Sequence, residues 1–445
     1  MTPPQSDAPY RVCVVGMGKI GLPLAVQFAS NAMTVLGADI NEAVVHSINS
    51  GVPHFPGEDQ LAERLGSLVE AGVIKAVTNT TEAVSQSNVV VIVVPLVVDH
   101  ESKVPNYAAI DAATAQIALG LQPGTLVVYE TTLPVGTTRN RFAPALAKGS
   151  GLTLGTDLYV CFSPERVSSG RIFADLRRYP KLVGGMDAAS TEVGVKFYQA
   201  ALEFDQRPDL LRPNGVWEMD SCEAAELAKL AETTYRDINI AFANELARHC
   251  DSLNVDVSNV IAASNSQPFS HIHQPGIAVG GHCIPVYPHL YLQGDPDASM
   301  PRSSRSTNDA MPDYCVRQLD VLLHGVRGKH VVVLGLAYRG GVKETAFSGA
   351  WAAVESLAKR GAIVSVHDPL YTDDELRGFG FIPYHLGEPV DGAIVQTDHH
   401  EYRSLSPQDL PGVQAVFDGR SVLDTTLFDR DGVRWQVLGR KKSAV

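Results

Sequence analysis

The sequence predicts an α/β protein built from two doubly wound parallel sheets that are joined by a long central helix. Three observations predict this fold. Strands and helices alternate through the first half of the chain, residues 220–254 have helical periodicity with few breakers, and a second strand, glycine loop and helix follow in the last third. Such alternation is typical of parallel sheets covered by helices, and 445 residues are too many for a single core.

The composition argues against several classes of protein. The net charge of −13, with no cluster of Lys or Arg, argues against nucleic-acid binding. The longest apolar run, residues 89–98, contains Pro95 and is too short to span a bilayer, so we expect a buried strand and no membrane association. No secretory signal is visible in residues 1–10, and the six cysteines form no Cys-x-x-Cys pair. We therefore expect a cytoplasmic protein without disulfides or a zinc site.

The first expected strand leads into a glycine-rich turn. In the segment RVCVVGMGKIGLPLA, Gly16, Gly18 and Gly21 form a G-x-G-x-x-G motif between an apolar strand and a helical pattern. This context is typical of a Rossmann-like dinucleotide-binding domain, because the glycines allow a tight turn and close approach to a pyrophosphate. Asp39 ends the next strand, where a carboxylate binds a ribose and disfavours a 2′-phosphate. We predict NAD as the cofactor; the alternative is a glycine turn that binds none.

Further strands are expected at residues 88–95, 125–132 and 158–165, with a helix at 107–121. Ligands of doubly wound sheets bind at the carboxyl ends of the strands. The loops at those ends are VPLVVD with Pro95 (94–99), ETTLPVGTT with Thr132 (130–138) and SPERVSSG with Glu165 (163–170). We expect the first two loops to contact the cofactor. Glu165 is either a solvated loop charge or a carboxylate that acts as a general base or orients water.

The central helix is expected over residues 220–254 and would span ~50 Å at 1.5 Å per residue, long enough to link two domains and to pair with a second copy. Lys229, Thr233 and Arg236 fall at i, i+4 and i+7 and are expected on one face. Lys229 is either solvated or an electrostatic anchor that points into a site. One further stripe contains Leu227, Ala231, Thr234, Ile238, Ala241 and Leu246.

A cysteine in an irregular segment is the strongest candidate for chemistry. Residues 275–288 read PGIAVGGHCIPVYP, and their glycines and prolines predict neither a regular helix nor a strand. Cys283 follows Gly280, Gly281 and a histidine. We interpret it as a nucleophile; the alternative is a buried free thiol in a structural loop.

The last third predicts a second Rossmann-like domain. Residues 295–309 are rich in Pro, Ser and Asp and are expected to be a connection, and a helix is expected at 311–323. A strand, glycine loop and helix then lead to a strand ending in Asp368. Because the full G-x-G-x-x-G is missing, we expect a smaller nucleotide group than a dinucleotide. Arg339 and Lys343 are candidate anion partners; the alternative for both is a solvated loop charge.

We divide the chain into three segments. Residues 1–208 are the expected NAD-binding domain, residues 209–325 a central helical segment for dimerisation that carries the cysteine loop, and residues 326–445 a second Rossmann-like domain that binds the smaller nucleotide group. His271 and His273 lack a third ligand at a matching spacing, so we predict no metal site.

These motifs resemble the nucleotide-sugar 6-dehydrogenase family, which includes the UDP-glucose, UDP-N-acetylmannosamine, UDP-N-acetylglucosamine and GDP-mannose dehydrogenases. The resemblance covers nearly the whole chain, through segments that follow the family's order. They are GMGKIGLPLA, ETTLPVGTT, FSPERV, AELAKLAETTYRDINIAFANEL, GGHCIPVYP, RSTNDAMPDY, VLGLAYRGGVKE and TDHHEY. The family fold has two Rossmann-like domains and a long helix that forms a dimer, so the resemblance implies a homodimer or a dimer of dimers.

The resemblance implies two successive NAD-dependent oxidations of a sugar C6 hydroxyl, first to an aldehyde and then to a carboxylate. Cys283 would capture the aldehyde as a thiohemiacetal, and a second hydride loss would leave a thioester that water hydrolyses. Lys229 matches the family lysine that stabilises oxyanions. Glu165 matches the carboxylate that activates water, and Thr132 matches a threonine near the reacting C6.

The same resemblance implies a UDP-hexose or UDP-N-acetylhexosamine as substrate, contacted by Lys229, Thr233, Gly280, Cys283 and Arg339. SPERV and GGHC are more similar to the N-acetylhexosamine branch. The chain departs from the UDP-glucose branch, or from related chains, at Ser169, Thr233, Phe269, Tyr287 and Ala346. Two alternative functions follow from these departures: a dehydrogenase that stops at the aldehyde, or a catalytically silent protein that binds NAD or a nucleotide sugar.

Overall fold

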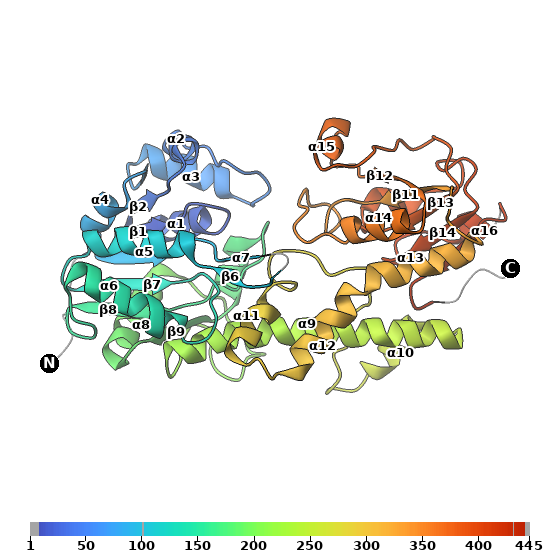
Figure 1. The fold of residues 1–445 in the computed structure, drawn as a ribbon. Coiled ribbons are helices and arrows are strands. Elements are labelled where there is room, and N and C mark those ends of the chain that lie inside the picture. The colour runs from blue at the N-terminus through green and yellow to red at the C-terminus, as the bar shows by residue number, and fades with distance from the viewer. Residues whose placement is uncertain (1–8, 100–101, 430, 441–445) are drawn as a thin grey trace. The chain divides into compact units, whose positions relative to one another are not determined.

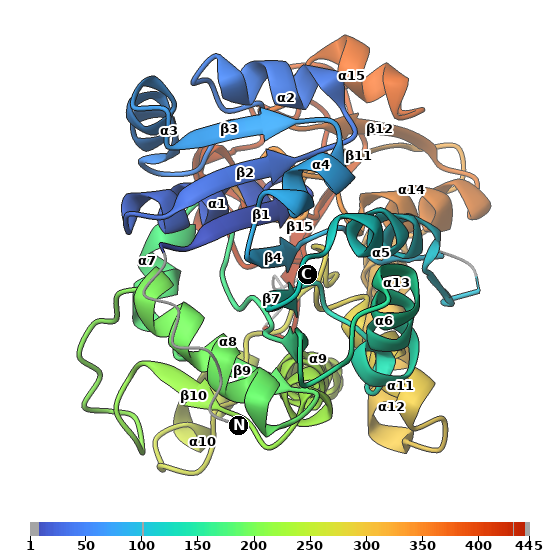
Figure 2. The same cartoon turned by 90° about the vertical axis from the view of Figure 1, so that its left-hand side faces the viewer.

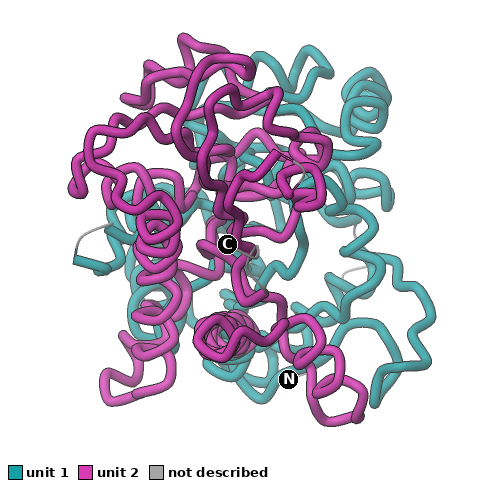
Figure 3. Tube along the Cα trace, turned by 90° about the vertical axis from the view of Figure 1, so that its right-hand side faces the viewer, with its two compact units in different colours: residues 1–231 teal, residues 232–445 magenta. Residues whose placement is uncertain are grey.

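The computed structural model describes residues 9–99, 102–429 and 431–440. The chain divides into two compact units, residues 1–231 and 232–445, which Figure 3 colours separately. Each unit contains a sheet flanked by helices (Figure 1). This confirms the predicted α/β fold with two Rossmann-like domains and a long helix, α9, that runs from the first unit into the second.

The first unit is built on an eight-stranded sheet in the order β10-β9-β8-β7-β4-β1-β2-β3, much of which can be followed in Figure 2. Its strands are β1 Arg11–Val15, β2 Thr34–Ala38, β3 Ile74–Val77, β4 Val89–Ile92, β7 Thr125–Tyr129, β8 Leu158–Phe162, β9 Lys181–Gly185 and β10 Val216–Glu218. Its helices are α1 Gly21–Ser30, α2 Glu42–Asn49, α3 Leu61–Glu70, α4 Thr80–Ser85, α5 Ala108–Gly120, η1 Thr138–Phe142, α6 Ala143–Ser150, α7 Ile172–Arg178 and α8 Ala188–Ala201. A small hairpin pairs β5 Val97–Val98 with β6 Pro105–Asn106.

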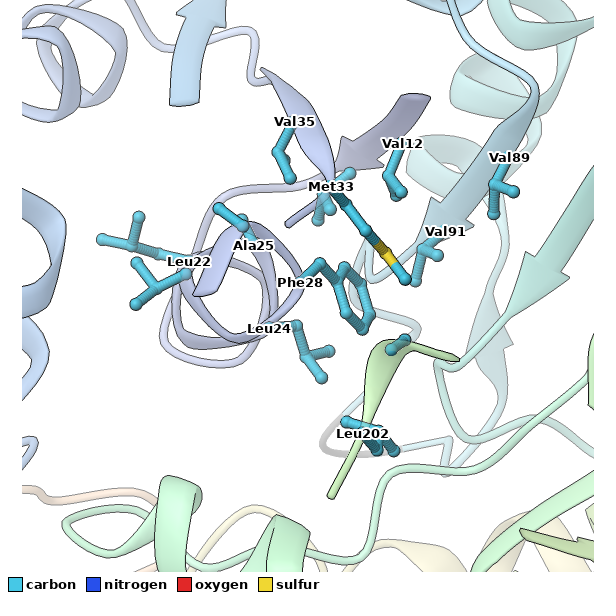
Figure 4. Close-up of a cluster of buried hydrophobic side chains, with 14 of the residues drawn as sticks. Val12, Leu22, Leu24, Ala25, Phe28, Met33, Val35, Val89, Val91 and Leu202 are labelled. Atoms are coloured by element: carbon cyan, nitrogen blue, oxygen red, sulfur yellow. The ribbon is translucent and has the colours of Figure 1, made fainter. Parts of the chain in front are cut away.

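Alternate residues of β1 pack on opposite faces of this sheet. Val12 and Val14 belong to one buried cluster, and Cys13 and Val15 belong to the other, as the two-residue period of a strand requires. Figure 4 shows Phe28 of α1 pointing toward Met33 and Val91 on the first face. Because both faces are covered, the strand is apolar throughout rather than alternating.

Two expectations for this sheet are wrong. The apolar run 89–98 is not one strand, since β4 ends at Ile92 and Pro95 separates it from β5. The sheet is not wholly parallel, because β8 and β9 pair antiparallel through Cys161 with Gly185 and Phe162 with Gly184. Consequently the beginning of β9 lies at the edge of the sheet where β7 and β8 end.

The second unit contains a five-stranded parallel sheet in the order β12-β11-β13-β14-β15. Its strands are β11 His330–Leu334, β12 Ile363–His367, β13 Gly392–Val395, β14 Ala415–Asp418 and β15 Arg434–Val437. Its further helices are α10 Val257–Ser264, α11 Tyr287–Gly294, α12 Ser299–Asp309, α13 Met311–Leu322, α14 Ala350–Lys359, α15 Asp373–Gly378, η2 His400–Ser404 and α16 Thr426–Asp429.

Two further expectations need correction here. Residues 299–309 form helix α12 instead of a connection, although the segment is rich in poor helix formers. Its buried side chains bind partners elsewhere in the unit, so tertiary contacts outweigh propensity. The cysteine segment is irregular as predicted up to Val286, but Tyr287 and Pro288 open α11, where proline is tolerated in the first turn.

Helix α9, Cys222–Leu253, buries polar as well as apolar residues, and the expected stripe is buried only in part, at Thr234 and Ala241. Leu227 and Ala231 of the expected stripe are exposed. The buried positions Asp237, Asn244 and Asp251 recur every seven residues, so they share one side of the helix.

Residues of this polar stripe form hydrogen bonds with α12 and with the cysteine segment. Asp237 accepts hydrogen bonds from Ser304 Oγ at 2.9 Å, Arg305 Nη1 at 2.7 Å and Asn308 Nδ2 at 2.8 Å. Asn244 Oδ1 accepts from the backbone N–H of Gly276 at 2.9 Å. Burial raises the pKa of Asp237 despite these donors.

The Arg305 guanidinium also donates to the carbonyl of Ile284, at 3.4 Å, next to Cys283. Together with the Asn244 contact to Gly276, it ties α9 and α12 to both ends of the cysteine segment. The segment therefore has a fixed path without being a helix or a strand.

Replacing Arg305 with Met should destabilise the folded protein by about 3–5 kcal/mol at neutral pH, because it leaves Asp237 buried without its charge partner. Folding raises the pKa of Asp237, so the folded protein loses stability as the pH rises above the pKa that this carboxyl has in the unfolded chain. The destabilisation caused by Arg305→Met should therefore grow between pH 5 and pH 8. Urea unfolding at both pH values measures it. The exposed Arg302 on the same helix is the control, and Arg302→Met should change stability by less than about 0.5 kcal/mol. Equal effects of the two substitutions would contradict the prediction.

Candidate active-site and cofactor residues

The glycine loop after β1 has two glycines that the fold itself requires. Gly16 has φ +91°, and a Cβ on Gly21 would lie 1.9 Å from the carbonyl oxygen of Gly16. A Cβ on Gly18 would meet no protein atom within 4 Å. Packing therefore gives no reason for glycine at position 18, whereas close approach of a pyrophosphate to the backbone does. The loop leads into the N-terminus of α1, where a phosphate is favoured.

Asp39 lies directly after β2 and is joined to this loop. Its Oδ2 accepts the N–H of Met17 at 2.9 Å, and its Oδ1 accepts the N–H of Asn41 at 2.9 Å. A carboxylate has about four acceptor positions, so both oxygens can still bind ribose hydroxyls. The residues present therefore fit NAD: Gly16, Gly18 and Gly21 would hold the pyrophosphate and Asp39 the ribose.

The loops 94–99 and 130–138 are joined to each other. Thr131 Oγ1 donates to the carbonyl of Val94 at 2.7 Å. Thr132 is buried next to it, and Pro95 is exposed. The geometry thus brings the two expected cofactor loops together, while the contact of Pro95 and Thr132 with NAD stays a prediction.

A buried glutamate that the sequence analysis missed fixes loop 130–138. Glu226 of α9 accepts the backbone N–H of Gly136 at 2.5 Å, and the N–H and hydroxyl of Thr138 at 2.9 and 2.6 Å. Burial raises the pKa of Glu226 to about 7, although these hydrogen bonds lower it. The residue lies in the helical pattern beside Leu227, and no local signal marks it as buried.

Glu165 is not a solvated loop charge, because its side chain is 10% exposed and pairs with Lys181. Lys181 Nζ lies 2.9 Å from Glu165 Oε2 and 2.9 Å from Glu130 Oε2. The Tyr198 hydroxyl donates to Glu130 Oε1. Burial raises the pKa of Glu130 to about 7. For Lys181, burial lowers the pKa, but Glu130 and Glu165 outweigh this and raise it.

Glu130 and Lys181 are likewise not among the residues predicted from the sequence. Glu130 directly follows the buried strand LVVY, and Lys181 opens the buried strand KLVGG. A charged residue at the boundary of a buried strand is the signal that could have found them. That signal does not predict that Glu130 and Lys181 form a pair. They do so because β9 runs antiparallel, which brings Lys181 to the edge of the sheet where β7 ends.

Cys283 lies in the irregular segment and is partly accessible, whereas the other five cysteines are buried. Burial raises the pKa of Cys13 and of Cys222 to about 12. Within the described residues all six cysteines are free. The alternative of a fully buried structural thiol therefore fits the other five cysteines and not Cys283.

The two glycines before Cys283 are required by their neighbours in the second unit. A Cβ on Gly280 would lie 2.5 Å from Cβ of Tyr338, and Gly281 has φ +93°. The N–H of Gly281 donates to the carbonyl of Ala346 at 2.8 Å. The cysteine segment therefore packs on loop 337–348, the glycine loop that follows β11.

A carboxylate holds loop 337–348, in the same way that Asp39 holds the glycine loop after β1. Asp368, after β12, accepts the N–H groups of Leu336 and Ala337 at 2.7 and 2.9 Å, as Asp39 accepts Met17. Arg339 is exposed, and among the described residues its side chain forms no ion pair. Lys343 pairs with Glu375 at 2.6 Å, so it is a weaker candidate for an anion partner.

Lys229, Thr233 and Arg236 all lie in α9 with the predicted spacing, but only Lys229 and Thr233 are buried, whereas Arg236 is exposed. Lys229 belongs to the first unit, and Thr233 belongs to the second with Cys283. The roles of these residues in catalysis and substrate binding stay proposals.

The described residues contain neither a candidate metal site nor a candidate membrane-spanning helix. No group of three or more His, Cys, Asp or Glu side chains there could hold a metal ion. In the same residues, every helix is either too short or too polar to cross a membrane.

Three family models match consecutive parts of the chain. They describe the NAD binding domain, central domain and UDP binding domain of the UDP-glucose/GDP-mannose dehydrogenase family, and they match residues 10–202, 223–309 and 332–425.

Curated relatives match nearly the full length. The UDP-N-acetyl-D-mannosamine dehydrogenase of Pyrococcus horikoshii is 34% identical, over 93% of this chain and 96% of the relative. The NDP-N-acetyl-D-galactosaminuronic acid dehydrogenase of Ralstonia nicotianae is 30% identical, over 94% and 97%.

Solved structures are similar over the same range. A UDP-D-ManNAc dehydrogenase of Pyrococcus horikoshii has a TM-score of 0.85 at 31% identity, covering 97% of this chain and 99% of the other. A UDP-glucose dehydrogenase of Pyrobaculum islandicum has a TM-score of 0.82 at 26% identity, over 94% and 96%. The glycine loop with Asp39, the second Rossmann-like unit and these matches together show that the chain belongs to the UDP-glucose/GDP-mannose dehydrogenase family and is an NAD-dependent nucleotide-sugar dehydrogenase.

Proposed function

We propose that the enzyme oxidises the C6 hydroxyl of a UDP-N-acetylhexosamine or a related UDP-hexose to the carboxylate in two NAD-dependent steps. The observation that carries the proposal is the state of Cys283, the accessible one among six described cysteines, in a segment fixed at both ends. The name of the relative in Pyrococcus horikoshii makes UDP-N-acetyl-D-mannosamine the first substrate to test.

Bound NAD supplies the oxidising power, since two NAD molecules each accept one hydride for every sugar oxidised. The sulfur of Cys283 adds to the aldehyde carbon, forming a C–S bond while the oxygen takes a proton. Loss of the remaining C–H hydride and of the hydroxyl proton leaves a thioester. Water then attacks the thioester carbonyl, the C–S bond breaks, and the sulfur leaves as thiolate. The sum is one alcohol and one water converted to one carboxylate and three protons.

The other proposed roles follow from residue chemistry and from the family resemblance. Lys229 stabilises the oxyanions that form at the reacting carbon. Glu165 accepts a proton from the attacking water, and Thr132 lies near the reacting C6. Thr233, Gly280 and Arg339 contact the substrate, whose nucleotide binds to residues 326–445, in the region that the UDP binding domain of the family matches.

Two alternative functions remain, and the first is suggested by specific residues. Thr233 and Tyr287 replace residues usual in the UDP-glucose branch, so the reaction could stop at the aldehyde. A silent protein that binds NAD or a nucleotide sugar is the third possibility. The partly accessible thiol of Cys283 favours complete oxidation, because the aldehyde-forming step alone needs no nucleophile.

Incubation with NAD and a panel of UDP- and GDP-sugars should give two NADH for each sugar consumed with at least one UDP-N-acetylhexosamine. Cys283→Ala should abolish uronate release, while Cys250→Ala, at a buried cysteine of the same unit, should retain it. One NADH per sugar would support the aldehyde-forming alternative. A folded protein that turns over no sugar, and is unchanged by Cys283→Ala, would leave only the silent alternative.

Gly18→Ala should leave the fold unchanged but weaken NAD binding at least tenfold, which is about 1.4 kcal/mol. A methyl group at this position meets no protein atom within 4 Å, and Gly18 is not among the glycines with positive φ. Gly21→Ala is the contrasting variant, because its methyl group would collide with the Gly16 carbonyl and should destabilise the domain. Titration calorimetry with NAD and thermal melting separate the two effects. Unchanged NAD affinity in Gly18→Ala would contradict the assigned pyrophosphate position.

We also propose that the protein is a homodimer that pairs through α9 and works in the cytoplasm. Three apolar side chains on one side of this helix are exposed: Leu227 by 43%, Tyr235 by 59% and Phe242 by 53%. An apolar stripe on an exposed helix face is typical of a buried interface. The unpaired cysteines support a reducing compartment.

Phe242→Glu should shift the protein from dimer to monomer, because a buried charge at the interface costs several kcal/mol. Light scattering after gel filtration measures the mass. Leu119→Glu, which places the same charge at a site in α5 that is 66% exposed, is the control and should stay dimeric. A dimer that persists in Phe242→Glu would rule out this face of α9.

A further inference from the structure

Three buried side chains, Glu130, Lys181 and Tyr198, meet the mostly buried Glu165 at one edge of the first sheet. Glu130 follows β7, Glu165 follows β8, and Lys181 begins β9. They meet because β9 runs antiparallel to β8, which places its first residue beside the loop that leaves β8. This is also the edge at which ligands of such sheets bind.

Lys181 is committed to this cluster. Its ammonium lies 2.9 Å from Glu130 Oε2, 2.9 Å from Glu165 Oε2 and 4.8 Å from the ring centre of Tyr198. The two carboxylates accept two of its three N–H bonds, and the Tyr198 ring lies nearby. The side chain is only 4% exposed, so burying it is costly without both carboxylates.

Glu165 is held at both oxygens. Oε2 accepts from Lys181, and Oε1 accepts the backbone N–H of Arg166 at 2.7 Å. Each oxygen keeps an acceptor position for one further hydrogen bond. The Arg166 guanidinium itself donates to the carbonyl of Pro180 at 3.4 Å, so it lies near the beginning of β9 as well.

The two carboxylates of the cluster are not equivalent. Glu130 is fully buried, receives the Tyr198 hydroxyl and has a pKa raised to about 7 by burial, whereas Glu165 is 10% exposed. With two carboxyls and one ammonium, a proton near neutral pH is held on the more deeply buried carboxyl. Lys181 also pairs with the second carboxyl, Glu165, at 2.9 Å.

We propose that Lys181, anchored by Glu130 and Tyr198, is a positioning residue that holds Glu165 as an oriented carboxylate for hydrolysis of the Cys283 thioester. This inference rests on the proposed function, in which Glu165 takes a proton from water as the water oxygen bonds to the thioester carbon and the C–S bond breaks. Without Lys181, Glu165 loses the cation that orients it and favours its carboxylate form, which is the form that accepts a proton from water.

Lys181→Met should slow thioester hydrolysis at least a hundredfold, the lower end of what general-base catalysis contributes. The first turnover should still release two NADH per active site, as a burst followed by a slow steady rate. The thioester should accumulate and appear in the intact-protein mass as an acyl adduct on Cys283. Lys181→Arg, which keeps the charge, should restore steady turnover at least partly and show no adduct.

Glu130→Gln provides a second test if Lys181→Met does not fold. It keeps the side-chain volume and leaves Lys181 to pair with Glu165 alone. Above pH 7, where Glu130 of the wild type ionises, the variant lacks that negative charge beside Glu165, so its pH–rate profile for hydrolysis should differ from the wild-type profile on the alkaline side. A purely structural role for the cluster would lower the melting temperature without moving the profile.

The outcomes distinguish failure of the proposed function from failure of the role proposed for Lys181. If the wild-type enzyme gives one NADH per sugar, the proposed function fails, and this inference fails with it. If the wild type gives two NADH but a folded Lys181→Met hydrolyses the thioester at the wild-type rate, or slows every step equally without an adduct, only the role of Lys181 is overturned. An unmoved pH profile in Glu130→Gln overturns it as well.

Discussion

A loop that leaves the end of a parallel strand carries backbone N–H groups that the sheet no longer pairs, and burying them unpaired would cost stability. In this protein, buried or partly buried carboxylates satisfy those groups. Asp39 accepts Met17, Asp368 accepts Leu336 and Ala337, and Glu226 accepts Gly136 and Thr138. Each of these loops is thereby fixed in the shape that its proposed ligand or substrate contact needs.

Carboxylates accept backbone N–H groups of other loops as well. Glu58 accepts the N–H groups of Gly170 and Ile172 at the end of the loop that begins with Glu165. Asp418 accepts three N–H groups after β14, from Arg420, Val422 and Leu423. Many acidic residues of this chain are therefore structural, which is one physical reason why a net charge of −13 does not prevent binding of anionic nucleotides. Glycine-loop N–H groups and single side chains such as Arg339 remain for the phosphates.

Two charged networks have cations at their centres. Lys181 joins Glu130 to Glu165 at the edge of the first sheet, and Arg305 joins Asp237 to the carbonyl beside Cys283 in the second unit. Both cations are almost completely buried, so each is held in place by the carboxylates around it. The carbonyl before Pro285 and the carboxylate of Glu165 thereby receive defined positions in parts of the chain that have no regular secondary structure.

The sequence by itself determined the features that depend on neighbouring residues. A strand followed by Gly16, Gly18 and Gly21 forms the cofactor loop, because its turn needs residues without a side chain, and Asp39 follows at the end of the next strand. Cys283 was found in the same way, since glycines and prolines around it exclude a helix or strand. The second Rossmann-like unit followed from the repeat of the strand, glycine loop and helix.

Only the tertiary structure decided which charged residues are buried and which partners they meet. Lys181 meets Glu130 because β9 runs antiparallel, a direction that no local pattern encodes. Helix α12 forms despite its composition because Arg305 and Asn308 bind Asp237, and α9 buries that polar stripe while exposing Leu227. The physical reason is common to all three: a buried charge is stable only where a distant part of the chain brings its counter-charge, and sequence periodicity reports the spacing along one element but not the element packed against it.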